Sequence, residues 1–163
     1  MQFQKIRFEE YKNACEEVFG PQDEEALRKE YDAIQLPKRS TYYSAAYDFF
    51  IPRDSNIFSS KAVLIPTGIR WVADDMDYVL LCVPRSGLGF RYGLRLVNTI
   101  GVIDSDYCKA DNEGHIMFKM VCDSTFKLKA GERFVQGIIT NFLVTDDDET
   151  DAQRTGGFGS TGK

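Results

Sequence analysis

Residues 98–107 read Asn-Thr-Ile-Gly-Val-Ile-Asp-Ser-Asp-Tyr, a short apolar run that ends in two carboxylates. Side chains alternate between the two faces of an extended strand, so we expect Asp104 and Asp106 on the same face. The apolar residues before them favour partial burial, and burial raises the proton affinity of a carboxylate. This pattern suits a general base that activates water. Taken alone, however, Asp-Ser-Asp is more often a turn or a solvated acid pair.

Short apolar runs of the same kind extend over most of the chain. From Tyr42 onward, runs rich in Val, Ile, Leu, Phe and Tyr alternate with Gly, Pro, Asn and Asp. No long helical period lies between these runs, and there are no internal repeats, which favours an all-β sandwich or barrel. The predicted strands are Ala45–Phe50, Ala62–Trp71, Tyr78–Val83, Leu94–Asn98, His115–Cys122 and Phe134–Val144.

The two ends of the chain differ from this β region. Apolar residues at three- and four-residue steps predict a helix over 8–19, and a second helix is predicted after the acids of 23–25. We expect this helical extension, residues 1–36, to pack on the β domain of residues 37–144, with docking of a partner as the alternative. An acidic run followed by a Gly-rich end predicts a mobile C-terminal arm over residues 145–163.

Composition excludes several classes of function. The 163 residues carry 20 Lys and Arg against 25 Asp and Glu, and the net charge of −5 disfavours capture of a nucleic acid polymer. A single histidine, His115, excludes a cluster of histidine metal ligands. The four cysteines have no Cys-x-x-Cys spacing, which indicates reduced thiols in a cytoplasmic protein. We expect neither a signal peptide nor a membrane span, because the longest apolar run is far too short.

Two stretches combine groups that bind anions. Pro84-Arg85-Ser86-Gly87-Leu88 would place a guanidinium, a hydroxyl and free amides at a turn or at the start of a short helix. Residues 156–163, Gly-Gly-Phe-Gly-Ser-Thr-Gly-Lys, follow Arg154, and backbone amides of such Gly-rich runs can approach phosphates closely. A P-loop needs a strand before it and a helix after it, which this context does not offer. The alternatives are an ordinary strand-ending turn for the first stretch and a disordered tail, rather than a lid, for the second.

Two single polar residues lie within apolar runs. Asp48 stands in Ala45-Ala46-Tyr47-Asp48-Phe49-Phe50, where it must face solvent, pair with an arginine or serve a cation. Gln136 stands in a predicted strand that follows Gly131-Glu132-Arg133. It would act as an orienting amide or only as a cross-strand hydrogen-bonding group.

The order of these stretches is more specific than any one of them. Ala-Ala-Tyr-Asp (45–48), Pro-Arg-Ser-Gly-Leu (84–88), residues 98–107, Gly-Glu-Arg-x-x-Gln (131–136) and Arg-x-Gly-Gly-Phe-Gly-Ser-Thr-Gly (154–162) resemble the five motifs of the homotrimeric dUTPase family. The resemblance runs from about Pro37 to Lys163. It implies a jelly-roll β-barrel, a homotrimer whose sites draw on three subunits, and Mg²⁺-dependent hydrolysis of dUTP to dUMP and pyrophosphate. Such an enzyme limits uracil in DNA and supplies dUMP for dTMP synthesis.

The resemblance also implies roles for the matching residues. Asp104 would be the general base, Tyr107 would pack under the deoxyribose and exclude a 2′-hydroxyl, and Asp48 would hold Mg²⁺ through water. The uracil would contact Asn98, Gly101, Val102, Ile103, Met117 and, from the lid, Phe158. The phosphates would be held by Arg85, Ser86, Gly87, Gln136, Arg154, Gly159, Ser160 and Thr161.

Three features depart from the family pattern. Ala46 stands where Gly is usual, residues 108–113 lengthen a hairpin tip that commonly has one residue, and residues 1–36 are additional. The last two features motivate an alternative function, a dUTP-gated regulatory protein that binds a partner through the helical extension or the hairpin tip. A dCTP deaminase or a bifunctional relative on the same fold is the other alternative, although no additional acid is evident for deamination.

Overall fold

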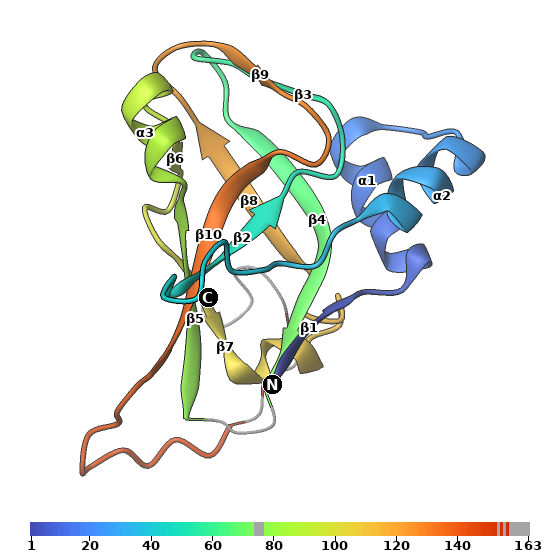
Figure 1. The fold of residues 1–163 in the computed structure, drawn as a ribbon. Coiled ribbons are helices and arrows are strands. Elements are labelled where there is room, and N and C mark those ends of the chain that lie inside the picture. Colours follow the sequence, from blue (N-terminus) through green and yellow to red (C-terminus); the bar gives the residue numbers. More distant parts are fainter. Residues whose placement is uncertain (74–76, 153, 155, 157–163) are drawn as a thin grey trace.

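The computed structural model describes residues 1–73, 77–152, 154 and 156 (Figure 1). Within these residues the chain forms two four-stranded sheets and one two-stranded sheet. The strand order is β1-β4-β8-β6 in the first sheet and β2-β10-β5-β7 in the second, and β3 pairs with β9. The predicted all-β class is therefore confirmed, with two separate larger sheets.

Each predicted strand has a counterpart in these sheets. The five that agree closely are β2 (Ala46–Phe50), β4 (Val63–Val72), β5 (Tyr78–Pro84), β8 (Ile116–Val121) and β10 (Arg133–Asn141). The predicted strand Leu94–Asn98 is reduced to β6 (Arg95–Leu96), because the chain turns at Thr99, which has a φ of 68°. β7 (Gly101–Asp104) lies within the stretch of residues 98–107 that was expected to be extended. The structure adds β3 (Ser55–Ile57) and β9 (Phe126–Leu128), which are too short for side-chain alternation to be evident.

Aromatic side chains join the two larger sheets in the core. The ring of Phe118 on β8 meets Phe49 on β2 edge-on at a centroid distance of 5.3 Å and Phe134 on β10 at 5.7 Å. All three side chains are buried in one apolar cluster that also includes Trp71 and Leu80. Burial of each such side chain contributes about 1.5–3 kcal/mol. This core fixes the strands from which the candidate site is built.

The N-terminal segment packs on the first sheet. β1 (Gln2–Lys5) pairs with β4, and α1 (Phe8–Phe19) and α2 (Glu24–Ala33) lie together beside β4 (Figure 1). Asp23 caps α2 by accepting a hydrogen bond from the backbone N–H of Ala26 at 2.8 Å. Tyr11 of α1 is buried and donates a hydrogen bond to Glu30 of α2 at 2.5 Å. The segment packs on the domain as expected, and it also adds an edge strand that the helical pattern did not predict.

A bulge in β4 ties this segment to β8. The pairing register shifts between Pro66 and Ile69, and Gly68 within the bulge has a φ of 71°. A Cβ on Gly68 would lie 3.2 Å from the Tyr11 ring, so glycine is needed for the close approach of α1. The backbone N–H of Gly68 donates to Nε2 of the buried His115 at 2.9 Å. The bulge therefore allows the buried His115 side chain to accept a hydrogen bond from β4 beneath α1.

The described residues also include all four cysteines. Cys15, Cys82, Cys108 and Cys122 are free thiols. Of the helices in the described ranges, none is long and apolar enough to span a bilayer.

Candidate functional site

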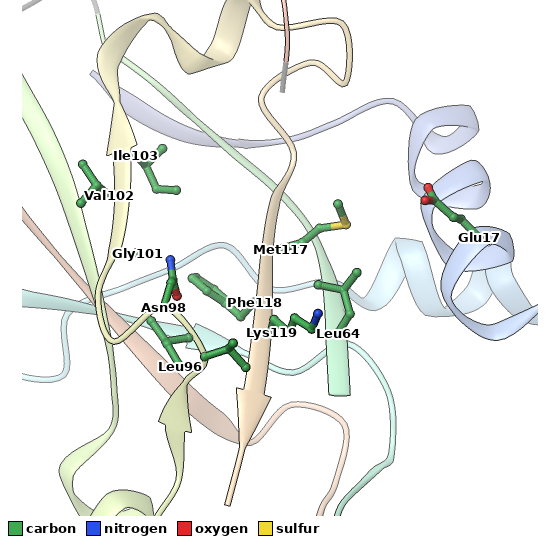
Figure 2. A pocket seen from close by; sticks show the side chains of 11 residues that line it. Glu17, Leu64, Leu96, Asn98, Gly101, Val102, Ile103, Met117, Phe118 and Lys119 are labelled. Carbon is green, nitrogen blue, oxygen red and sulfur yellow. The ribbon is translucent and has the colours of Figure 1, made fainter. Parts of the chain in front are cut away.

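An apolar pocket of about 420 Å³ opens beside β6, β7 and β8 (Figure 2). This volume is in the range of small-molecule sites. Five of the residues that were predicted to contact the base line this pocket: Asn98, Gly101, Val102, Ile103 and Met117. Four of these residues precede the hairpin tip of residues 108–113 in the sequence, and Met117 follows it. The structure brings all five together.

Other residues of the pocket had not been singled out from the sequence; they are Glu17, Leu64, Leu96, Val97, Phe118 and Lys119. Glu17 projects from α1 on the side opposite the β7 residues (Figure 2). Lys119 and Leu64 are cross-strand partners on β8 and β4. No local pattern could have identified Glu17, because its approach depends on how α1 packs on β4.

A tight corner before β7 forms one wall of this pocket. Thr99 adopts the left-handed region, and the backbone N–H of Ile100 donates to the carbonyl of Asn98 at 2.7 Å. Gly101 then pairs with Cys82 of β5, where a Cβ on residue 101 would lie 3.2 Å from the Cβ of Cys82. The absence of a side chain at Gly101 therefore lets β7 approach β5 and keeps the corner narrow.

The paired carboxylates lie where β7 ends. Asp104 is its last residue and a 3-10 helix (Ser105–Lys109) begins directly after it, so the prediction that Asp104 and Asp106 share a strand face is wrong. They nevertheless share a partner, because Arg154 pairs with Asp104 through Nη2 and donates to Asp106 through Nε at 2.8 Å. The side chain of Asp104 is 51% exposed and that of Asp106 is 36% exposed, so Asp106 is the more buried of the two carboxylates. A neighbouring cation is the shared partner of both.

Tyr107 is fixed at its hydroxyl. It is buried in the 3-10 helix and donates a hydrogen bond to the backbone carbonyl of His115 at 3.0 Å. Nδ2 of Asn112 donates to the same hydroxyl at 2.9 Å. The guanidinium of Arg154 lies 5.7 Å from the ring centroid, and burial raises the pKa of the phenol. The ring is therefore held in one orientation beside the two carboxylates.

A second polar cluster forms around Asp48 on the other sheet. β10 lies between β2 and β5, and Gln136 is the cross-strand partner of Asp48 on one side and of Val83 on the other. Nε of Arg85, which follows β5, lies 3.7 Å from Oδ1 of Asp48. The structure thus brings together three residues that the resemblance assigns to phosphate and metal binding.

The short helix α3 (Ser86–Tyr92) begins next to Arg85. The amides of Ser86 and Gly87 lie in its first turn, where backbone N–H groups have no partner within the helix. Nothing lies within 4 Å of a Cβ built on Gly87, so space alone does not require glycine there. This geometry agrees with the predicted start of a short helix and places amide donors beside a guanidinium.

Two further residues hold Asp48. Ser40 donates to Oδ2 of Asp48 at 2.5 Å, and Nη1 of Arg133 lies 3.1 Å from the same oxygen. Arg133 also donates to Ser40 at 2.6 Å. Arg133 belongs to the Gly-Glu-Arg-x-x-Gln stretch, whereas Ser40 lies in the loop before β2 and carried no sequence signal. Together they occupy Oδ2 and leave Oδ1 toward Arg85.

The donor set around Asp48 fits a cation that keeps most of its waters. Across the described residues no three His, Cys, Asp or Glu side chains gather closely enough to hold a metal ion. Mg²⁺ is commonly bound by one or two carboxylates together with water and substrate phosphates. Asp48 can contribute one such contact through Oδ1, which suits water-mediated binding rather than a complete protein cage.

The C-terminal motif is described only in part. Arg154 and Gly156 belong to the described residues. The residues predicted to form the rest of the lid lie outside them; these are Phe158, Gly159, Ser160 and Thr161.

A pocket of small-molecule size, a carboxylate pair held by an arginine and a separate cluster of Asp48 with arginines define the class of protein, a β-sheet protein with a small-molecule site bordered by charged groups. The dUTPase family model matches residues 32–162. The chain belongs to the dUTPase family.

Several known proteins are similar to this chain. The deoxyuridine 5′-triphosphate nucleotidohydrolase of Lactococcus lactis subsp. lactis is 42% identical over 134 residues, 79% of this chain and 89% of the relative. The protein of the same name from Paraburkholderia phytofirmans is 38% identical over 138 residues, 79% of this chain and 90% of the relative. A dUTPase structure from Streptococcus mutans has a TM-score of 0.66 at 34% identity and covers 90% of this chain and 99% of that chain. A phage phi11 dUTPase that coordinates a structural Mg(II) ion has a TM-score of 0.61 at 15% identity over 74% of this chain and 92% of that chain, a likeness of fold.

Proposed function

We propose that the chain is a dUTP diphosphatase, which hydrolyses dUTP to dUMP and pyrophosphate. The observation that carries this proposal is the pair Asp104 and Asp106, bound to Arg154 at the end of the strand that lines the apolar pocket. Relatives named deoxyuridine 5′-triphosphate nucleotidohydrolase at 42% and 38% identity support the choice of substrate. The reaction would keep uracil out of DNA and provide dUMP for dTMP synthesis, in the cytoplasm.

In this mechanism Asp104 takes the proton from the water that attacks the α-phosphorus. Its half-exposed side chain is accessible to that water, and a positioned general base contributes about 10²–10⁴-fold to the rate. In the free protein Arg154 pairs with both carboxylates. A bound triphosphate competes for this guanidinium, and its transfer to the phosphates leaves Asp104 free to act as the base.

The base of the nucleotide occupies the pocket beside β7. The Asn98 amide and the backbone groups of Val102, Ile103 and Met117 offer donors and acceptors to the uracil edge, and Gly101 keeps this wall narrow. Tyr107 packs under the deoxyribose, where a 2′-hydroxyl would collide with the ring. Phe158 in the C-terminal arm covers the base.

The phosphates bind at the second cluster and under the arm. Their ligands are Arg85, Ser86, Gly87, Gln136, Arg154, Gly159, Ser160 and Thr161. Asp48 would hold Mg²⁺ through water, and such an ion would supply charge neutralisation at the phosphates. Ser40 and Arg133 keep the Asp48 carboxylate in place for this contact.

A homotrimeric jelly-roll assembly fits the distribution of these groups. The pocket lining and the Asp48 cluster have no residue in common, so a complete site is readily built from more than one subunit. Leu143 and Phe90 are 95% and 93% exposed in the single chain, which supports burial against neighbouring copies. Mass photometry should give three times the chain mass of 18.5 kDa. An active, strictly monomeric enzyme would contradict shared sites.

Pyrophosphate release from dUTP, dCTP, dTTP and UTP tests the proposed function. We expect turnover of dUTP and little turnover of the other three. Ammonia release from dCTP would instead indicate a deaminase. Tight binding of dUTP without turnover would indicate a dUTP-gated binding protein, whose partner surface would then be sought on residues 1–36 or 108–113.

A further inference from the structure

Two parts of the chain that are additional to the minimal family pattern contact each other. They are the N-terminal segment of residues 1–36, most of which precedes the family match at residues 32–162, and residues 108–113, which lead from the end of the 3-10 helix into the turn of residues 111–114. The backbone N–H of Arg7 donates to Oε2 of Glu113 at 3.0 Å, and its Nε donates to Oε1 at 2.5 Å. The Glu113 side chain is only 13% exposed, whereas the Arg7 side chain is 82% exposed, so the buried partner of this two-pronged contact is the carboxylate of the turn. The N-terminal segment is therefore anchored to the turn.

Asn112 connects the same turn to Tyr107. Its Nδ2 donates to the Tyr107 hydroxyl at 2.9 Å, while its Oδ1 accepts from the backbone N–H of Gly114 at 3.1 Å. The hydroxyl has a single proton, which it donates to the carbonyl of His115 at 3.0 Å. The Asn112 amide must then be the donor in its bond with Tyr107. The Tyr107 hydroxyl is thus held by two groups, the Asn112 amide of the turn and the backbone carbonyl of His115, the residue that directly precedes β8.

The backbone of the turn depends on such contacts. Glu113 has a φ of 59°, an unfavourable conformation for a residue with a side chain, and Gly114 has a φ of 74°. A Cβ on Gly114 would lie 2.6 Å from the Cα of Cys108, so the turn packs directly on the 3-10 helix that carries Tyr107. The contact from Arg7 stabilises the strained residue that follows Asn112.

We propose that Asn112, held in place by the contact between Glu113 and Arg7, is a positioning residue for Tyr107. The N-terminal segment thereby sharpens the selection of deoxyribose over ribose. This inference rests on the proposed function, in which the Tyr107 ring excludes the 2′-hydroxyl. Exclusion by a ring requires that the ring resist displacement, and the hydroxyl contacts of Tyr107 supply that resistance.

The readout is the ratio of kcat/KM for dUTP to kcat/KM for UTP. Asn112→Asp keeps an acceptor for the Gly114 N–H and removes the donor to Tyr107. We expect the ratio to fall by about three- to tenfold, the effect of one lost hydrogen bond. The exposed neighbour Asp111 provides the matched control, and Asp111→Ala should leave the ratio unchanged. A wild-type ratio in Asn112→Asp overturns the inference.

The contribution of the N-terminal segment is tested separately. Arg7→Ala should lower the same ratio, because it removes the guanidinium contact with Glu113 and leaves only the hydrogen bond from the backbone N–H of residue 7. Lys12→Ala is the control, since its ion pair with Glu24 joins α1 to α2 without reaching the turn. If both variants keep the wild-type ratio, or both lower it equally, the specific link from the segment to Tyr107 is refuted.

A double-mutant cycle identifies the route of the effect. Tyr107→Phe keeps the ring and removes the hydroxyl through which Asn112 is proposed to act. The variant with both Asn112→Asp and Tyr107→Phe should have the same ratio of kcat/KM for dUTP to kcat/KM for UTP as Tyr107→Phe alone. Additive losses would show that Asn112 acts elsewhere and would overturn the inference.

NMR spectra of protein with labelled tyrosine distinguish failure of this inference from failure of the proposed function. The ring resonances of Tyr107, assigned by their loss in Tyr107→Phe, should shift in Asn112→Asp and Arg7→Ala and stay in place in Asp111→Ala. A wild-type protein that does not hydrolyse dUTP would refute the function, and the spectra would still decide whether Asn112 positions the ring. Unshifted resonances in Asn112→Asp would refute the positioning role in either case.

Discussion

Mild acid should destabilise this fold through His115, its only histidine. The side chain is fully buried, and its Nε2 accepts a hydrogen bond from the Gly68 N–H at 2.9 Å. Nε2 therefore carries no proton, and the imidazole is neutral. Protonation would remove this acceptor and place a charge without a partner in the core. Burial accordingly lowers the pKa of His115 from 6.5 to about 3.

The direction of the effect follows from proton binding in the two states. Because the folded-state pKa of His115 lies below the unfolded value, the unfolded chain binds more protons between the two. The contribution of neutral His115 to the free energy of unfolding is fully present above pH 6.5 and is lost as the pH falls from 6.5 toward about 3. One pKa unit is worth about 1.4 kcal/mol, so at about pH 5 the free energy of unfolding should be about 2 kcal/mol lower than at about pH 8.

Urea unfolding measures this loss directly. The fluorescence of Trp71, the only tryptophan and a buried one, reports the transition at a single protein concentration. His115→Gln is the control, because its amide does not titrate and can still accept from Gly68. Its stability should be lower at about pH 8 and should change less with pH than that of the wild type. Parallel pH profiles for the two proteins would refute the assignment to His115.

Three further predictions concern the proposed reaction. Asp104→Asn should lower turnover by about 10²–10⁴-fold while a non-hydrolysable dUTP analogue still binds, and near-normal turnover would remove Asp104 from the role of base. Truncation after Thr150 should abolish most activity with little change in melting temperature, because it removes Arg154 and the lid motif; a wild-type rate would show that the arm is no lid. Ser40→Ala should raise the Mg²⁺ concentration for half-maximal activity by about threefold or more, the effect of one hydrogen bond. Thr41→Ala, which loses only a contact with the Ser44 side chain, should not, and equal shifts in both would contradict the role of Ser40.

The strands that the sequence predicts best are those with long apolar patterns. β4 (Val63–Val72) and β10 (Arg133–Asn141) were predicted to within a few residues, since each carries enough residues for its pattern to be read. β1 has only four residues, Gln2–Lys5, and forms because β4 offers it a free edge. Tertiary pairing of this kind leaves no local pattern in the sequence.

The same limit applies to the candidate site. Asn98 and the three residues of 101–103 form much of the pocket wall and lie close together in the chain, so they could be grouped from the sequence. The surroundings of Asp104 could not, because its partner Arg154 is 50 positions away. Asp48 was ambiguous from the sequence among solvent, an arginine partner and a cation. In the structure the arginine pairing is present, since Arg133 binds Oδ2 of Asp48 and Arg85 lies 3.7 Å from Oδ1, and the role of Asp48 toward a cation stays a prediction.

His115 shows how stability and specificity can be separated in this fold. Its side chain accepts from Gly68 in the β4 bulge, whereas its backbone carbonyl accepts from the Tyr107 hydroxyl. A change of the imidazole therefore alters the packing under α1 but retains the acceptor for Tyr107. For Asn112 it is the side chain that contacts Tyr107. This side chain also hydrogen-bonds to Gly114 of the turn and, within the described part of the chain, makes no hydrogen bond to the β4 bulge. The N-terminal segment contacts both regions, through Tyr11 at Gly68 and through Arg7 at Glu113, so separate contacts stabilise the fold and, under the proposal above, position the Tyr107 ring.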